Sequence, residues 1–217
     1  HQASNSNGQF NMASILDGTL MKDQPSLAVT LVDNHDTQPC QALESPVLDW
    51  FKDAAYAFIL LRAQGYPNIF YADYYGASYQ TSDNNCNNTS ITIASHKDAI
   101  NMLLDARKQY AHGPQLDYLD HHDVIGWVRQ GNTDNPKAMA VIMTDAGAGT
   151  KWMDVARVNT EFKDITGNHS ATVNSNQDGW AEFPVNAGSY SVWVEQGQQQ
   201  SNVIPTTFSC HNGYTYW

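Results

Sequence analysis

Short apolar runs and amphipathic stretches alternate through the first half of this chain. Ala28–Val32 reads Ala-Val-Thr-Leu-Val, a β-branched run typical of a short strand buried on both faces. Further along the chain, apolar residues recur at helical spacing. The Ser45-Pro46 pair is predicted to start this helix and Gly65 to end it. This amphipathic helix is predicted to bury Phe51, Ala54, Ala55, Phe58 and Ile59.

A second helix is predicted from about Ile93 to Tyr110, with Ile100, Leu103 and Leu104 on its buried stripe. Beyond it, the pattern changes to short β-type runs separated by clusters of Gly, Asn and Asp. The clearest of these runs are Val124–Val128, Ala138–Met143 and Ser191–Val194. The second half of the chain is therefore predicted to form an antiparallel β domain, with its tryptophans in the core; a role as sugar-binding platforms is the alternative.

Four consecutive polar residues, Asp33 to Asp36, follow the first predicted strand. They supply two carboxylates, an amide and an imidazole, which are groups able to bind the hydroxyls of a sugar. In a (β/α)8 barrel the carboxyl ends of the strands form the catalytic face, so these side chains favour a functional site. The alternative is a capped turn, because Asp and Asn are common loop residues. We expect Asp33 and Asn34 to order the loop through backbone hydrogen bonds.

Four segments resemble the α-amylase family, glycoside hydrolase family 13. Leu31–Asp36 resembles the motif that closes the seventh barrel strand in that family, and Gly65–Gly76 resembles its eighth-strand motif. Ala106–Tyr110 and Asp120–Trp127 are similar to segments of the liquefying-type bacterial amylases and their fungal relatives. The resemblance extends over roughly residues 1–195, and the motifs occur in the family's order.

The resemblance implies an α/β plus all-β fold: the last two strand-helix units of a (β/α)8 TIM barrel, followed by an antiparallel Greek-key β-sandwich. Residues 1–110 would form the C-terminal part of the catalytic barrel and residues 111–196 the sandwich. Residues 197–217 would form a linker and the start of a starch-binding module, because Phe208–Trp217 faintly resembles a family 20 module; a disordered tail is the alternative.

Two strands cannot close a barrel or bury their own faces. The sequence also starts at His1, without an initiator Met or a signal peptide. We therefore expect this chain to be the C-terminal portion of a longer enzyme, whose missing N-terminal part supplies the other barrel strands.

The activity implied by the resemblance is that of an endo-acting α-amylase, which hydrolyses internal α-1,4-glucosidic bonds of starch with retention of configuration. Asp36 resembles the family's catalytic carboxylate that stabilises the transition state, and His35 and Asp36 would both bind the sugar that is distorted. The nucleophile and the general acid are expected outside this segment. An α-glucan transglycosylase and a non-catalytic glucan-binding relative remain alternatives. Asp73 and the tyrosines near it would line or support the cleft.

Calcium is the cofactor that the resemblance implies. Hard cations take six to eight oxygen ligands from carboxylates and backbone carbonyls. In liquefying-type amylases, the positions matching Asp123 and Asp145 hold a calcium ion between the barrel and the sandwich. The backbone carbonyls of Gly8, Phe10 and His122 would complete this site; a solvated surface pair of carboxylates is the alternative.

The net charge of −11 excludes some partners. A nucleic acid or an anionic membrane would require a face rich in Lys and Arg, so we expect neither. No apolar run reaches the roughly 18 residues of a transmembrane helix. Starch and malto-oligosaccharides are neutral and compatible with this charge, and we expect a monomer.

The cysteine usage is consistent with a secreted, extracellular protein. Cys40 and Cys86 would lie in loops on the same barrel face, where a disulfide is sterically allowed, leaving Cys210 unbridged. Overlapping sequons at Asn87-Asn88-Thr89-Ser90 and one at Asn168-His169-Ser170 make Asn88 and Asn168 candidate glycosylation sites in a eukaryotic host. Sequons in an Asn-rich chain also arise by chance.

Overall fold

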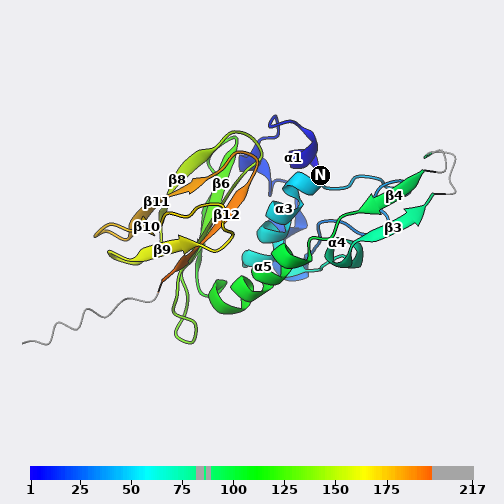
Figure 1. Cartoon of the computed structure of the whole chain (residues 1–217). Helices are drawn as coiled ribbons and strands as arrows, with labels where there is room; N and C mark the ends of the chain where they lie inside the picture. Colours follow the sequence, from blue (N-terminus) through cyan, green and yellow to red (C-terminus); the bar gives the residue numbers. More distant parts are fainter. Residues whose placement is uncertain (82–85, 87–88, 197–217) are drawn as a thin grey trace, which may run out of the picture.

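The computed structural model describes residues 1–81, 86 and 89–196 of the chain (Figure 1). It combines a helical part, a β hairpin that projects from one side and an antiparallel β domain. The module predicted for residues 197–217 and the Asn88 sequon lie outside the described residues. Within those residues, no helix has the length and apolar character needed to cross a bilayer.

Two helices form the centre of the helical part. α3 (Asp49–Leu61) packs beside α5 (Lys97–Tyr110). As predicted, α3 buries Phe51, Ala54, Phe58 and Ile59, whereas Ala55 is half-buried. The shorter helical elements are α1 (Gln2–Asn5), η1 (Met12–Ser14), α2 (Leu20–Asp23), η2 (Pro25–Leu27) and α4 (Tyr71–Tyr75).

α3 has different boundaries from those predicted. It begins at Asp49, so the Ser45-Pro46 pair lies outside the helix. It ends at Leu61 rather than near Gly65, because the backbone becomes extended at Arg62.

α5 also differs from its prediction. It begins at Lys97, because Ile93 is the last residue of a strand that precedes the helix. Ile100 and Leu103 are buried, but Leu104 is 36% exposed and does not belong to the buried stripe. The apolar spacing of a helix does not define the exact edge of its buried stripe. Contacts with neighbouring elements decide whether a residue at that edge is buried.

Two very short strands flank α3. β1 (Val29–Thr30) and β2 (Tyr66–Pro67) pair in parallel. The prediction that Ala28–Val32 is a strand buried on both faces is wrong in extent and in burial, since Val29 is 65% exposed and Leu31 is 43% exposed. Among the described residues β1 has one strand partner, so its outer edge and its Val29 face stay uncovered.

The projecting hairpin consists of β3 (Ala77–Gln80) and β4 (Ser90–Ile93), paired in antiparallel register (Figure 1). It leads from α4 to α5. Along the chain, β2 is followed by α4 and then by the hairpin. The hairpin lies on the same side of the helical part as α4 (Figure 1).

The antiparallel β domain that the sequence predicted is present as two sheets. Six strands lie in the order β10-β9-β12-β7-β6-β5, and β8 pairs with β11 in a separate two-stranded sheet. The bounds are β5 (Gln115–Tyr118), β6 (Val124–Arg129), β7 (Met139–Thr144), β8 (Gly149–Asp154), β9 (Glu161–Asp164), β10 (Val173–Asn174), β11 (Trp180–Val185) and β12 (Tyr190–Glu195).

The central strands β6, β7 and β12 of the six-stranded sheet are buried on both faces. On one face, Trp127 of β6 packs edge-on against Phe58 of α3 at 5.6 Å between ring centroids. On the other face, Trp193 packs against Phe183 of the two-stranded sheet. These tryptophans are core residues, as predicted, whereas Trp152 and Trp180 are exposed. Burial on both faces explains the continuous apolar runs of β6 and β7.

Candidate functional site

A compact loop follows β1 and is ordered by Asn34. The Asn34 side-chain oxygen accepts hydrogen bonds from the backbone N–H groups of Asp36 and Thr37, both at 2.9 Å. The Asn34 N–H donates to the Thr37 hydroxyl at 3.0 Å. These bonds form the local network expected of an Asx turn, as the sequence predicted for Asn34.

This loop presents His35 and Asp36 to solvent. Their side chains are 81% and 52% exposed, and His35 Nε2 lies 3.5 Å from Asp36 Oδ1. A carboxylate beside an imidazole offers hydrogen-bond acceptors and a donor, which suits the hydroxyls of a sugar. The structure therefore brings together the two predicted substrate-binding residues.

Asp33, at the base of the loop, is buried in an ion-pair network that the sequence did not reveal. Lys52 Nζ lies 2.9 Å from Asp33 Oδ2 and 2.7 Å from Asp73 Oδ1. The Tyr56 hydroxyl donates to Asp73 Oδ2 at 2.7 Å, and the Val47 N–H donates to Asp33 Oδ1 at 3.2 Å. Lys52 and Tyr56 are four residues apart and so lie on the same side of α3, but no periodic pattern relates them to Asp33 and Asp73.

Burial and the ion pairs act in opposite directions on the pKa values of Lys52 and Asp33. Burial lowers the pKa of Lys52, but hydrogen bonds and attraction from Asp73 and Asp33 outweigh it, so the net pKa is raised. Burial raises the pKa of Asp33, and the hydrogen bond from Lys52 offsets only part of the effect. Asp73 is fully buried here, which supports the packing role among the alternatives for this residue.

Three segments meet around the predicted cation ligands. The Met12 N–H donates to the His122 carbonyl at 2.6 Å. A Cβ atom added to Gly8 would lie 3.0 Å from Ala146 Cβ, so the N-terminal segment also contacts the residue after Asp145. His122 Nδ1 lies 2.5 Å from Asp123 Oδ1, which leaves the second Asp123 oxygen for another partner. The Met12 contact was not predicted from the sequence.

Asp145 fits a cation ligand. Both carboxylate oxygens are buried, and no donor from another described residue reaches them. Burial raises the pKa of Asp145, and the charge of nearby Asp123 raises it further. Buried carboxylates normally carry a hydrogen bond or bind a metal, so a hard cation would remove the cost of this arrangement. The carbonyl of Phe10 stays a predicted ligand.

Cys40 and Cys86 form a disulfide with 5.9 Å between their Cα atoms. The bridge joins the loop after β1 to the connection between β3 and β4. The Tyr79 hydroxyl also donates to the Pro39 carbonyl at 2.5 Å, so the hairpin holds this loop at two points. Glu44 lies within 4.8 Å of both sulfurs, but bridged sulfurs are not available as thiolate ligands.

Removing the bridge should destabilise the protein. The disulfide spans 46 residues, a separation for which the chain-entropy model gives at most about 4 kcal/mol. We expect the C40S/C86S double variant to unfold at a lower denaturant concentration than the parent protein. Cys210→Ser, which leaves the bridge intact, is the control; equal unfolding midpoints for all three proteins would contradict the expectation.

Stability should fall at alkaline pH through His96. Its Nδ1 lies 2.7 Å from Asp53 Oδ1, and this hydrogen bond is the main cause of a raised His96 pKa. Burial and Lys52 lower that pKa, while the charges of Asp53 and Asp49 raise it. Because the folded-state pKa exceeds the unfolded value, the stabilisation is complete below about pH 6.5 and is lost as the pH rises through the folded-state pKa.

The pH dependence of unfolding provides the measurement. The wild-type protein should lose more stability between neutral and alkaline pH than His96→Gln, which keeps a hydrogen bond but cannot ionise. Parallel stability curves for the two proteins would rule out this role of His96.

Asn168 is exposed, but its amide nitrogen is engaged. It donates to the Tyr190 carbonyl at 2.7 Å and to the Ser189 hydroxyl at 3.3 Å. A glycan on this nitrogen would replace one of the two hydrogens. Glycosylation at Asn168 stays a prediction.

Comparisons with known proteins agree with the motifs. Residues 141–194 match the family model described as α-amylase C-terminal. The chain is 50% identical over 206 residues to an α-amylase of Geobacillus stearothermophilus, which covers 94% of this chain and 36% of that protein. It is 47% identical over 199 residues to a glucan 1,4-α-maltohexaosidase of Bacillus sp. strain 707, covering 90% of this chain and 36% of that protein.

Solved structures show the same fold at lower identity. A γ-CGTase from an alkalophilic Bacillus clarkii matches with a TM-score of 0.60 and 19% identity, over 91% of this chain and 30% of that protein. An α-amylase from Geobacillus thermoleovorans, solved with acarbose, matches with a TM-score of 0.56 and 14% identity, over 81% of this chain and 40% of that protein. The resemblance to α-amylases is confirmed over nearly the whole chain.

Proposed function

We propose that this chain is the C-terminal part of an endo-acting α-amylase; 94% of it matches the Geobacillus stearothermophilus α-amylase, of which it spans 36%. The longer enzyme would hydrolyse internal α-1,4-glucosidic bonds of starch and malto-oligosaccharides with retention of configuration. The observation that carries the proposal is the loop after β1, which presents His35 and Asp36 side by side to solvent.

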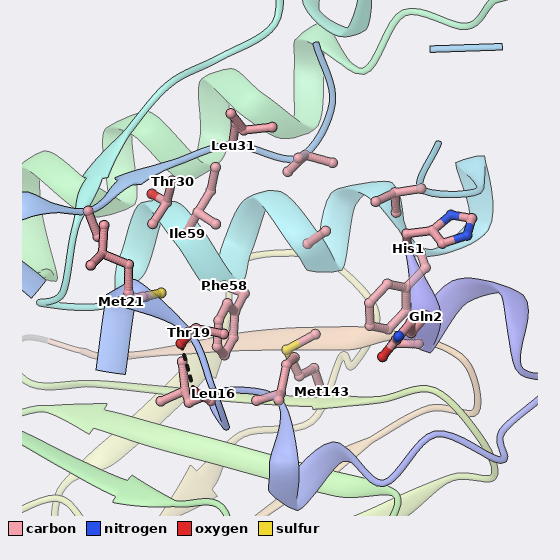
Figure 2. Close-up of a pocket in the computed structure, with 18 of the residues that line it drawn as sticks. His1, Gln2, Leu16, Thr19, Met21, Thr30, Leu31, Phe58, Ile59 and Met143 are labelled. Atoms are coloured by element: carbon pink, nitrogen blue, oxygen red, sulfur yellow. Dashed lines mark hydrogen bonds between the residues drawn. The ribbon is translucent and has the colours of Figure 1, made fainter. Parts of the chain in front are cut away.

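The exposed side of β1 supports a barrel that is completed by other residues. A cavity of about 550 Å³ lies beside this strand (Figure 2). Met21, Leu31, Phe58 and Met143 line it together with other mainly apolar side chains. Because an uncovered strand edge and an apolar cavity are costly in water, we infer that the preceding part of the same polypeptide packs here. β1 and β2 would then be the last two strands of a (β/α)8 barrel.

The proposed chemistry requires two further carboxylates. Retaining glycosidases place a nucleophile and a general acid about 5 Å apart across the scissile bond. Neither is assigned within this chain, so both belong to the part of the enzyme that precedes it. The charge of Asp36 would stabilise the positive charge that develops on the distorted sugar, and it would accept hydrogen bonds from that sugar's hydroxyls. His35 would donate to the same ring.

Calcium is the proposed cofactor. Asp123 and Asp145 would hold it with their carboxylates, and Gly8, Phe10 and His122 with their carbonyls. The buried Asp145 oxygens, which lack donors, support this assignment. The cation would join the N-terminal segment to the β domain, because its other ligands lie just before β6 and just after β7, which are neighbouring positions in the sheet.

We further propose that the enzyme is secreted and acts outside the cell as a monomer. The disulfide supports an oxidising compartment, where such bridges persist. The acidic net charge of −11 supports a neutral glucan, rather than a nucleic acid or an anionic membrane, as the partner.

Digestion of starch by the longer enzyme tests the proposed function. We expect a rapid fall in the size of soluble amylose and the release of malto-oligosaccharides, analysed by chromatography. Products longer than the added malto-oligosaccharide substrate would indicate transglycosylation. Binding of amylose without any cleavage would indicate a glucan-binding relative and would overturn the hydrolase assignment.

A further inference from the structure

Lys52 is a buried cation whose side chain is 4% exposed. It lies near the start of α3, and its ammonium contacts two carboxylates from different segments. Asp33 belongs to the segment that follows β1, and Asp73 belongs to α4, which follows β2. The carboxyl ends of the two parallel strands are therefore joined through one side chain of the helix that connects them.

Each of the two carboxylates also accepts a hydrogen bond from a group other than Lys52. The Val47 N–H donates to Asp33 Oδ1, and the Tyr56 hydroxyl donates to Asp73 Oδ2. The backbone carbonyl of Asp73 also accepts the His96 N–H at 2.7 Å. Asp73 is thus fixed from three sides, whereas Asp33 connects this fixed point to the loop that carries Asp36.

The charges explain why Lys52 is needed. Asp33 and Asp73 both contact the Lys52 ammonium, and a buried carboxylate without a partner is strongly unfavourable. Without Lys52, the two carboxylates would lose the cation that they share. Asp33 is the one that can move, since it begins an exposed loop.

We propose that Lys52 is a positioning residue for the substrate loop: its ammonium fixes Asp33, and through Asp33 the location of Asp36 relative to α4. This inference rests on the proposed function. Lys52 does not contact the sugar. A displacement of about 1 Å at a reacting site can cost on the order of 100-fold in rate, so a small shift of this loop is sufficient.

The kinetics of Lys52→Met and Asp33→Asn in the longer enzyme test the proposal. Asp33→Asn preserves shape and can still accept from Val47, so it keeps the test valid if Lys52→Met folds poorly. For each we expect kcat on starch to fall roughly 10- to 100-fold with KM changed less than about threefold, because a contact made in the transition state is misplaced. Lys52→Arg, which keeps the cation, should retain more activity than Lys52→Met.

Arg62→Met provides a matched control. Arg62 is equally buried, and it pairs with Asp117 at 2.7 Å just beyond the other end of α3. This variant should lower the melting temperature without changing kcat. A kcat within twofold of wild type for folded Lys52→Met and Asp33→Asn, or an equal loss of kcat in Arg62→Met, would overturn the proposal.

Hydrogen exchange separates this inference from the proposed function. The backbone amides of Asp36 and Thr37 should exchange faster in Lys52→Met and Asp33→Asn than in wild type, while those of Arg62→Met should not. If the wild-type enzyme fails to cleave starch but these amides respond, the proposed function is wrong and the structural role of Lys52 holds. Unchanged exchange in both loop variants would contradict that role.

Discussion

Asp36→Asn in the longer enzyme should reduce kcat on starch by at least about 10²- to 10³-fold. The substitution keeps the shape of the side chain but removes its charge, and the loss of one preorganised transition-state contact typically has an effect of this size. Because Asp36 is half-exposed and its neighbours bond to its backbone, the melting temperature should stay nearly unchanged. Initial rates on soluble starch and a thermal melt are the measurements.

Asp105→Asn is the matched control for Asp36. Asp105 is an exposed aspartate of α5, and the same substitution there should leave kcat within twofold of wild type. Retention of more than about a tenth of the wild-type kcat by Asp36→Asn would remove this residue from the catalytic site. If Asp36→Asn no longer showed a cooperative melting transition, Asp36 would have a structural role instead.

Calcium should raise the melting temperature of the longer enzyme, and Asp145→Asn should abolish most of this rise. A ligand present at 100 to 1,000 times its dissociation constant stabilises by about 2.7–4.1 kcal/mol. This corresponds to a rise of roughly 5–15 °C for a protein of about 150–250 residues, and to a smaller rise of several degrees for the longer enzyme. Without calcium, Asp145→Asn should be at least as stable as wild type, because it replaces a buried carboxylate that lacks donors.

Asp120→Asn is the control for the calcium experiment. Asp120 lies close in sequence to Asp123 and pairs with Lys151, but it is exposed and is not among the proposed ligands. Its variant should respond to calcium as wild type does. An equal calcium response in wild type and Asp145→Asn would rule out Asp145 as a ligand.

Periodicity predicted the elements whose burial is continuous. The runs at β6, β7 and β12 are strands, and the apolar stripe of α3 faces the core, because both patterns arise from local geometry. The exposed face of β1 could not be predicted in the same way. An apolar run indicates a buried strand, but Val29 and Leu31 are exposed in the part of the chain that the structure describes.

The substrate loop was predictable because it is local in sequence. Asn34, His35 and Asp36 are neighbours along the chain, so their motif and their turn geometry could be read together. The Lys52 network joins three segments. A lysine in an amphipathic helix is normally assigned to the solvent-exposed face, so its burial was not predicted. Long-range ion pairs of this kind depend on the fold and have no periodic signal.

A crystal structure of the longer enzyme with a bound malto-oligosaccharide analogue tests the central claim most directly. We expect one sugar ring to lie within hydrogen-bond distance, about 2.5–3.2 Å, of both His35 and Asp36. The segment that precedes this chain should pair with the free edge of β1 and bring two further carboxylates to the same ring. A sugar bound elsewhere, with His35 and Asp36 open to solvent, would contradict the account.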